Sequence, residues 1–250
     1  MKIFKIAVIL LLAASLALSS IGCAGNTNKE EVGKDEIISS EKTDKTGRES
    51  SETPGQDAGE MLDLGKKEGD IYKNNYFGLS FKLPKDWKVA SEEELKQVLN
   101  TGKKIAADDN ESKQDELDSA ESKSAYLIMV SKTEMTGQTY KTGNFMVTAD
   151  KLSSLQGITN VNQYLEQVKA GMMSIKDQMP YNLDKPIYLE KIGDKEFAVL
   201  ETSIYSEGIK LTQKYYAYVI KDYVLVFIAT STNEDYAKVI QDMLDSVKFE

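Results

Sequence analysis

The fold is decided by residues 186–230, which read PIYLEKIGDKEFAVLETSIYSEGIKLTQKYYAYVIKDYVLVFIAT. Four runs in this stretch are rich in β-branched and aromatic residues, and they cover residues 186–192, 197–205, 209–220 and 223–230. The segments between them are Gly193-Asp194, Ser206-Glu207-Gly208 and Lys221-Asp222, and connections this short are typical of β-hairpins. Because strands joined by hairpins are antiparallel neighbours, the stretch predicts a four-stranded antiparallel meander.

Amphipathic helices are predicted before and after the meander in the sequence. The first follows Asn160, a residue type that is preferred at helix N-caps. Its apolar positions recur with helical spacing and are Val161, Tyr164, Leu165, Val168 and Met172. After the meander, Ser231 and Glu234 predict the cap of a closing helix. The apolar stripe of that helix consists of Tyr236, Val239, Ile240, Met243, Leu244 and Val247.

The chain before residue 160 predicts further strands and another helix. Residues 70–73 and 77–83 predict a hairpin that turns at Asn74-Asn75, because asparagine tolerates left-handed backbone geometry. Ser91 and Glu94 form a capping box ahead of an apolar helical stripe. Strands are also predicted at residues 126–131 and 144–152.

The N-terminus has the pattern of a secretory signal. Lys2 and Lys5 precede an apolar stretch at residues 6–18. As a helix this stretch spans about 20 Å, less than the roughly 30 Å hydrocarbon core of a bilayer. The pattern therefore indicates a signal h-region and not a spanning helix.

A modification site is predicted directly after this signal. Gly22 precedes Cys23, the only cysteine of the chain, in a pattern that resembles a bacterial lipobox, although Ser20 stands where leucine is usual. In that pattern the chain is cut before the cysteine, whose thiol carries diacylglycerol, and acyl chains such as palmitate complete the anchor. We therefore predict a lipoprotein signal peptide at residues 1–22 and lipid attachment at Cys23. The alternative is an ordinary secretory signal or an uncleaved anchor.

The composition limits the partners and the chemistry of the chain. Two or more acyl chains give stable membrane attachment, so the predicted location is the extracytoplasmic face of a bacterial cell membrane. Loss of residues 1–22 leaves 29 basic against 40 acidic residues, a net charge of −11, which disfavours nucleic acid as a partner. The chain has no histidine, which excludes serine–histidine triads and, with a single cysteine, most zinc sites and intramolecular disulfides. No cofactor is predicted.

Residues 23–70 predict an acylated cysteine followed by a polar tether. Between residues 24 and 70 there is no aromatic residue. Such a composition buries too little apolar surface to offset its ordering entropy, so disorder is expected. Aromatic residues begin at Tyr72 and continue to Phe249, which predicts one folded domain at residues 71–250.

The folded part resembles the PsbP-like domains. The resemblance rests on Tyr72, on NYFGLSFKLPKDW at residues 75–87, and on the strand and hairpin around residues 214–216 and 222–225. It covers residues 70–250 and implies an α/β/α sandwich, in which helices flank a central antiparallel sheet. Known members mostly act as adaptors that bind or stabilise partners. The histidines proposed to bind metal in plant members have no counterpart here, so no metal site is implied.

Acidic residues gather between the predicted capping box and the next strand. They are Asp108, Asp109, Glu111, Asp115, Glu116, Asp118 and Glu121. Hard cations prefer such oxygen ligands, but a calcium loop starting at Asp108 has Lys113 at its glycine position and Ser119 at its closing glutamate. The motif therefore fails, and a solvated segment is expected.

Several other residues are candidates for catalysis, metal binding or contact with a partner, although none of them belongs to a recognised motif. Glu201 on a predicted strand is a candidate acid–base residue of a cell-wall hydrolase, although the sequence specifies no partner for it. Three methionines are candidates for a copper(I) site or, as we expect, for core filling: Met172, Met173 and Met179. Trp87 is expected to be a core residue near the first turn of the sheet. A contact surface is suggested by Tyr205, Tyr215, Tyr216 and Tyr218.

These observations together predict a lipid-anchored, non-catalytic binding module for an envelope protein partner. The alternative is a small-ligand or ion-binding lipoprotein that serves a transporter, and a cell-wall hydrolase is the third hypothesis. A single domain of about 180 residues lacks the two lobes of hinge-closing solute receptors, which disfavours the alternative.

Overall fold

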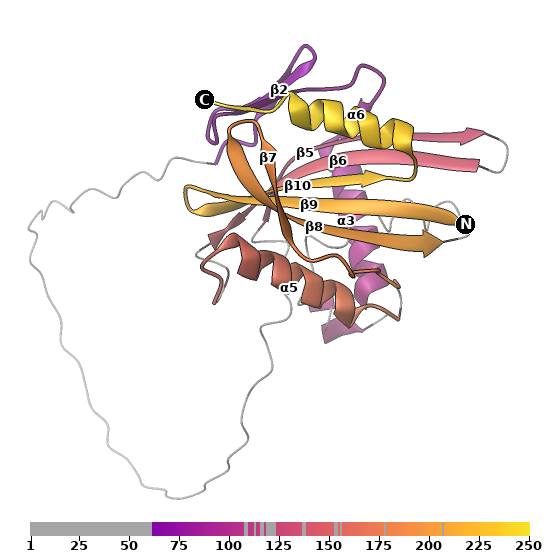
Figure 1. The fold of residues 1–250 in the computed structure, drawn as a ribbon. Coiled ribbons are helices and arrows are strands. Elements are labelled where there is room, and N and C mark those ends of the chain that lie inside the picture. Colours follow the sequence, from indigo (N-terminus) through magenta and orange to yellow (C-terminus); the bar gives the residue numbers. More distant parts are fainter. Residues whose placement is uncertain are drawn as a thin grey trace, which may run out of the picture. The chain divides into compact units, whose positions relative to one another are not determined.

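A computed structural model describes most of the chain after residue 61. The described residues are 62–107, 110–112, 114, 115, 118, 124–136, 139–152, 155, 157–177, 179–206 and 208–250. The predicted signal peptide, Cys23 and the tether up to residue 61 lie outside them. Figure 1 shows the arrangement of the helices and strands.

The centre of the structure is a seven-stranded antiparallel sheet. In spatial order it consists of β4 (Lys88–Val89), β5 (Ser124–Thr136), β6 (Thr139–Lys151), β10 (Tyr223–Ser231), β9 (Ile209–Ile220), β8 (Lys195–Ser206) and β7 (Tyr188–Ile192). Strands β7 to β10 are successive antiparallel neighbours. The predicted meander is therefore confirmed, and β10 pairs on its other side with β6.

A second, four-stranded sheet joins the two ends of the described chain. Its order is β1 (Lys66–Glu68), β2 (Ile71–Asn74), β3 (Leu79–Lys82) and β11 (Lys248–Phe249). The Glu250 amide donates to the Gly78 carbonyl at 2.8 Å. Gly78 has a φ of 61°, and a Cβ there would collide with the Glu250 carbonyl. Glycine is therefore required where the C-terminal strand docks on β3.

Two expectations for this region need correction. The fold begins before residue 71, because β1 lies inside the predicted tether. Its three residues are exposed and charged, so they form no apolar pattern, and the strand is held by backbone pairing with β2. The left-handed residue of the β2–β3 turn is Gly78 and not Asn74 or Asn75. Asn74 stabilises the turn differently, because its side chain accepts a bond from the Phe77 amide at 2.9 Å.

Three helices pack on the large sheet, and their caps explain where they begin. They are α3 (Glu92–Ala107), α5 (Val161–Ser174) and α6 (Glu234–Asp245). The capping box of α3 is confirmed, since Glu94 and Ser91 exchange hydrogen bonds at 3.0 and 3.2 Å. The Asn160 cap of α5 is confirmed as well.

The sequence-based prediction was wrong about the N-cap residue of α6 and about where the apolar stripe of this helix ends. Asn233 is the N-cap and accepts a bond from the Tyr236 amide at 2.9 Å, whereas Ser231 is the last residue of β10. Val247 is buried but follows the helix, in the turn to β11. The local sequence does not show which polar residue is the N-cap or where the helix ends, because helix ends and turns share the same polar residue types.

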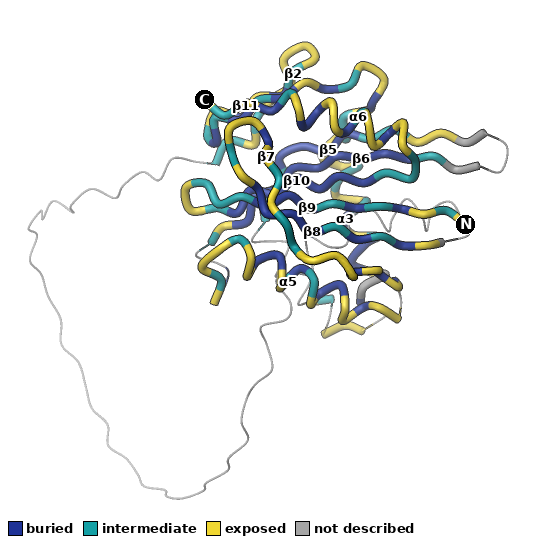
Figure 2. The backbone as a smooth tube through the Cα atoms, in the orientation of Figure 1, coloured by how far each residue is buried: buried dark blue, intermediate teal, exposed yellow. Residues whose placement is uncertain are grey.

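Helices lie on both faces of the sheet, so the predicted α/β/α sandwich is confirmed. Along β10, Val224, Val226 and Ile228 pack in one core with α5 residues such as Leu165. Phe227 points to the opposite face, where α6 contacts β6 and β10. We call these the α5 face and the α6 face. Figure 2 shows that the middle strands are buried along most of their length.

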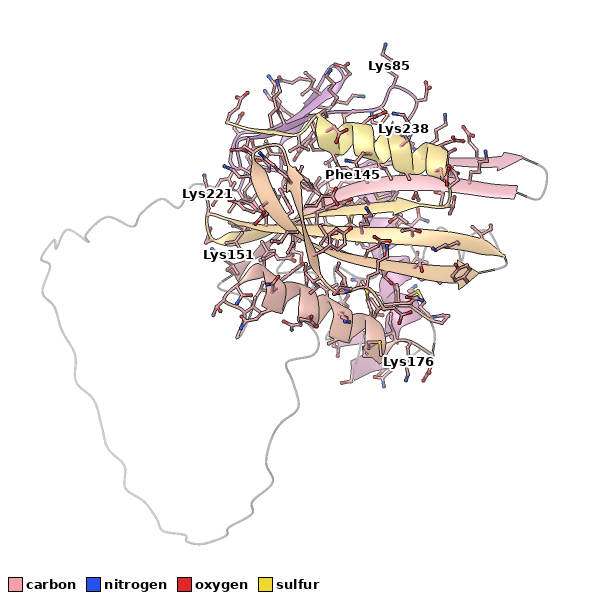
Figure 3. The ribbon with its side chains drawn as sticks, viewed as in Figure 1. Lys85, Phe145, Lys151, Lys176, Lys221 and Lys238 are labelled. Carbon is pink, nitrogen blue, oxygen red and sulfur yellow. The ribbon has the colours of Figure 1, made fainter. Side chains whose placement is uncertain are left out.

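The small sheet is tied to one end of the large sheet by aromatic contacts. Tyr76 packs edge-on against Tyr223, with ring centroids 5.7 Å apart. Lys221 lies in the β9–β10 turn and has a left-handed φ of 55°. Its ammonium group is 4.0 Å from the Tyr76 ring centroid. Figure 3 shows Lys221 and Lys151 at this end of the sheet.

Candidate functional site

The most direct site prediction, lipid attachment at Cys23, lies outside the described residues and stays a prediction. Within the described part of the chain, no helix is long and apolar enough to cross a membrane.

The acidic segment is described only in part. Asp108, Asp109, Glu116 and Glu121 lie outside the described residues. Asp118 accepts a hydrogen bond from Lys103, whose side chain is only 8% exposed. This bond lowers the pKa of the Asp118 carboxyl. Of the seven acidic residues, Glu111, Asp115 and Asp118 are described, and Asp118 neutralises the buried ammonium group of Lys103. No cluster of three or more metal-ligating side chains occurs in the described part of the chain.

Glu201 lies on the α6 face, opposite Lys214 of the neighbouring strand. Its Oε1 accepts a bond from Lys185 Nζ at 2.5 Å, and its Oε2 accepts one from the Tyr188 hydroxyl at 3.4 Å. Burial, together with the charges of Glu201 and Glu190, raises the pKa of Tyr188 to about 12. The Tyr188 hydroxyl therefore stays protonated at neutral pH and donates a hydrogen bond to Glu201, whose other carboxylate oxygen is held in the ion pair with Lys185.

One hollow in the described part of the chain is a groove beside α6. It has a volume of about 380 Å³. It is lined by Lys210, Thr212, Lys214 and Tyr216 of β9, by residues around the start of α6, and by Ala229, Ala237, Ile240 and Leu244. We call it the α6 groove. It offers lysine ammonium groups along one wall and methyl groups along the other.

The strands next to the α6 groove extend its surface. Tyr205 of β8 pairs in register with Lys210, and the Lys210 ammonium group lies 5.8 Å from the Tyr205 ring centroid. Lys214 is placed similarly over Tyr216, at 5.9 Å. Tyr205 is 64% exposed, whereas Tyr216 is buried. A lysine–tyrosine surface of this kind suits contact with a protein partner.

The other predicted residues divide between the core and the surface. Trp87 is 8% exposed and packs edge-on against Tyr236, so its core role is confirmed. A Cβ at Gly143 would lie 2.5 Å from the Trp87 ring, which explains the glycine beneath it. Tyr215 is buried, and Tyr218 is half-buried against Phe197 and Phe249. Met172 and Met179 fill the core as expected, while Met173 is exposed.

A buried polar cluster on the α5 face was missed. Asp150 of β6 has no exposed surface, and its Oδ2 accepts a hydrogen bond from the Tyr164 hydroxyl of α5. Ser124 of β5 is its cross-strand partner. Burial raises the pKa of Asp150 to about 6. The sequence predicts an alternating strand here, and alternation suggests that the polar side faces water. In the fold Asp150 is instead buried, and its hydrogen-bond donor, Tyr164, comes from another element, α5.

Another hollow follows the edge of the sheet between α3 and β5. It has a volume of about 570 Å³. Residues 124–129 of β5 form its floor, Leu95 and Leu99 of α3 form one wall, and Leu64 and Tyr72 form the other. Lys66, Lys67, Lys96 and Glu92 are its charged residues. We call it the edge cleft. No motif in the sequence indicates it, because its walls come from segments that are far apart along the chain.

Comparisons with known proteins found similarity only among solved structures. No protein-family model and no curated protein matches the sequence. The solution structure of cyanobacterial PsbP (CyanoP) from Synechocystis sp. PCC 6803 is 11% identical and covers 75% of this chain and 99% of that chain, with a TM-score of 0.39. LpqN, a protein involved in cell envelope biogenesis of Mycobacterium tuberculosis, is 10% identical over 67% of this chain and 78% of that chain, with a TM-score of 0.33.

A crystal structure from Bacteroides thetaiotaomicron VPI-5482 is 14% identical, with a TM-score of 0.35, and matches 69% of this chain. The match spans only 45% of that chain, less than half of its length. These structures include a PsbP-like protein, from the family that the sequence resembles. At these identities the similarity implies nothing about ligand, partner or activity.

Proposed function

We propose that this chain is a lipid-anchored, extracytoplasmic binding module that holds an envelope protein partner without catalysing a reaction. The observation that carries the proposal is the incomplete cover of the α6 face. Helix α6 contacts β6 and β10, and the strands beyond them carry the α6 groove and the exposed Tyr205. A sheet face of this kind, with tyrosine and lysine side chains, has the composition of a partner interface.

The side chains of this face support binding better than catalysis. Glu201, the candidate acid–base residue, is held in an ion pair with Lys185. The chain has no histidine, and its single cysteine is the predicted lipid site. A fixed arrangement of lysines, tyrosines and carboxylates, which include Glu201 and Glu234, favours recognition of a complementary charged surface.

The anchoring part of the proposal rests on the sequence around Cys23. Acylation there would hold the domain at the outer face of the cell membrane, within reach of envelope proteins. In Cys23→Ala, we expect loss of acyl labelling and release of the protein from the membrane fraction, or an unprocessed precursor. Acyl labelling that persists in this variant would contradict the anchor.

Photo-crosslinking in cells tests the binding surface. Benzoylphenylalanine replaces Tyr205 in one strain and Leu189 in another. Both positions are well exposed, at 64% and 60%, but Leu189 pairs with Ala198, which belongs to the α5-face core. We expect one recurrent protein adduct from position 205, and none from position 189.

The adduct must depend on the groove itself and on the anchor. The double substitution Lys210→Glu and Lys214→Glu reverses the charge of one groove wall and should abolish it. Cys23→Ala should abolish it as well, because the partner is expected at the membrane. Equal adducts from both positions, or an adduct indifferent to the groove lysines, would contradict the proposal.

The small-ligand hypothesis makes a different prediction for the same groove. Its volume of about 380 Å³ lies within the range of small-molecule pockets. A ligand at 100 times its dissociation constant would add about 2.7 kcal/mol of stability. A thermal-shift screen of metals, amino acids, sugars and peptides therefore separates the two hypotheses, and a large shift with a small molecule would favour the ligand.

A further inference from the structure

We infer that the partner protein inserts an amphipathic helix into the α6 groove, with the apolar side of this helix against α6 and its acidic side against β9. The inference rests on the proposed function and deepens it, because it names the kind of partner segment that the groove takes.

The first observation is that the described helices cover the two faces of the large sheet unequally. On the α5 face, Leu95 and Val98 of α3 pack against the same core as Leu165 of α5, so two helices share this face. On the α6 face, α6 contacts β6 and β10 of the large sheet. The next strands in the sheet are β9 and β8, and among the described helices none lies mainly over them on this face.

The second observation is that the uncovered strands have the width of one helix. Packed helices lie about 8–10 Å apart, and neighbouring strands lie about 4.8 Å apart, so one helix covers about two strands. Helix α6 lies over β6 and β10. A helix packed beside it would therefore lie over β9 and β8.

The length of the groove also fits a helix. It is lined by β9 between residues 210 and 216 and by α6 between residues 234 and 244, so it follows both elements. In Figure 1, α6 runs in nearly the same direction as β9 and β10. With about 3.3 Å per strand residue and 1.5 Å per helix residue, the groove is roughly 15–20 Å long. A helix of about 10–13 residues has this length.

The third observation is the small size of the side chains between the two walls. Ala229 of β10 and Ala237 of α6 line the groove, and Ala237 is exposed. Ile240 and Leu244 line it as well but are buried, so they add apolar surface without filling the space. Short side chains on a helix allow another helix to approach closely. Aliphatic side chains at helical spacing on the partner would fill the hollow.

Charge selects the acidic side of the partner helix. Lys210 and Lys214 line the β9 wall, and Glu201, which is in register with Lys214, is held by Lys185. The two groove lysines are four residues apart on a strand, which is about 13 Å. Two carboxylates about two helical turns apart would reach both ammonium groups. Glu234 lines the α6 wall, so acidic residues are disfavoured on that side.

Binding of a defined helical peptide to the full chain tests the inference. The probe is a fluorescein-labelled peptide of alanine and glutamine, with leucine at positions i, i+4, i+7 and i+11 and glutamate at i+1 and i+8. This pattern places the leucines on one side of a helix and both glutamates on an adjacent side. A matched probe carries one central proline, which breaks the helix without changing the charge. We expect saturable binding of the first probe and at least about tenfold weaker binding of the second.

Charge reversal locates the bound helix. The double substitution Lys210→Glu and Lys214→Glu should weaken binding of the probe at least about tenfold. A probe with lysine in place of both glutamates should bind this variant better than it binds the wild type, which shows that the variant is folded. The control is Lys176→Glu with Lys238→Glu, which changes the net charge equally outside the groove lining and should leave binding unchanged (Figure 3).

A steric variant tests the apolar wall. Ala237→Trp places a large side chain at an exposed position of α6 that lines the groove, so it should weaken binding at least about tenfold. Lys238→Trp, at the next position of the same helix and outside the groove lining, serves as the control and should bind the probe normally.

Several results would overturn the inference. These are no saturable binding up to about 1 mM, equal affinity for the helical and the proline probe, or binding that is indifferent to the groove lysines. If the helical probe fails while position 205 still gives its adduct in cells, the partner helix is refuted and the binding surface stands. If the adduct itself is missing, the proposed function fails, and with it the partner that supplies the helix.

Discussion

The two faces of the seven-stranded sheet are buried in different ways. On the α5 face, helices cover residues of mixed character, and Asp150, Thr148 and Asn144 of β6 are fully buried. On the α6 face, the covered part is aromatic, with Phe227 between Phe145 and Phe197 at centroid distances of 5.6 and 5.2 Å. The rest of this face is the polar surface beside the α6 groove.

Because of this difference, we expect the buried parts of both faces to stabilise the fold and the uncovered strands to contact a partner. The aromatic part of the α6 face and the core of the α5 face supply apolar burial, which is the main source of folding free energy. The buried carboxyl of Asp150 opposes folding at neutral pH, whereas the uncovered strands contribute little and are free to contact a partner. Substitutions on each region should therefore have effects of different size and sign.

The largest effect is expected for Phe227→Ala. Phe227 is fully buried among other rings, so its removal leaves a cavity that the neighbouring strands cannot fill. We expect a loss of about 3–5 kcal/mol in the free energy of unfolding, measured by denaturant titration. Leu189→Ala, at an exposed position, serves as the control and should change stability by less than about 0.5 kcal/mol. A cost below about 1 kcal/mol for Phe227→Ala would show that this face is not a packed core.

The second effect concerns Asp150→Asn and has the opposite sign. Burial raises the pKa of Asp150 to about 6, so the folded state holds a proton that the unfolded state loses near pH 4. The stability contributed by this proton is complete below about pH 4 and is lost as the pH rises to about 6. At pH 7 the ionised carboxyl is therefore a penalty of about 3 kcal/mol relative to acid, and asparagine should remove most of it.

The measurement for Asp150→Asn is the free energy of unfolding at pH 4 and pH 7. The variant should exceed the wild type at pH 7, and the difference should shrink at pH 4. Tyr164→Phe removes the hydroxyl that donates to Asp150 and should destabilise the protein more at pH 7 than at pH 4. A wild type whose stability relative to the variant is independent of pH would contradict the shifted pKa.

A smaller effect distinguishes the two candidate caps of α6. Asn233 accepts the Tyr236 amide bond, so Asn233→Ala should cost about 1 kcal/mol in chemical unfolding. Ser231→Ala should cost less than about 0.5 kcal/mol, because Ser231 ends β10 and caps nothing. A larger loss of stability for Ser231→Ala than for Asn233→Ala would mean that Ser231 is the N-cap, as the sequence predicts.

The smallest effect on stability is expected for Tyr205→Ala. Its ring is mostly exposed on the uncovered strands, so circular dichroism melts should show a change within about 0.5 kcal/mol. The amount of partner that co-purifies with the protein after general crosslinking in cells should nevertheless fall sharply. A large loss of stability would mean that this tyrosine belongs to the core and not to a contact surface.

Features with a local cause were predictable from the sequence. The hairpins between β7 and β10 depend on short turns, and the caps of α3 and α5 depend on side chains within three residues of each other. The burial of Trp87 followed from its size and apolar surface. The predicted location of the protein also rests on the sequence alone, because the predicted signal around Cys23 lies outside the described residues.

Features that join distant segments were not predictable. Strand β11 has two residues and no apolar alternation of its own, and it forms only because β3 offers a free edge beside the C-terminus. The same holds for β1, which consists of exposed charged residues. Short strands of this kind are held by backbone hydrogen bonds, which nearly every residue type can form, so the sequence shows no pattern for them.

The sequence alone determined the longer strands and two of the three helix caps, since each depends on residues that are near one another in the chain. The anchor at Cys23 stays a prediction from the sequence. The tertiary structure alone decided which surfaces are available to a partner. Whether Asp150 is buried and whether Tyr205 is exposed depend on where the helices pack on the sheet. Periodicity shows that a strand has two sides, but only packing against another element decides which side water reaches.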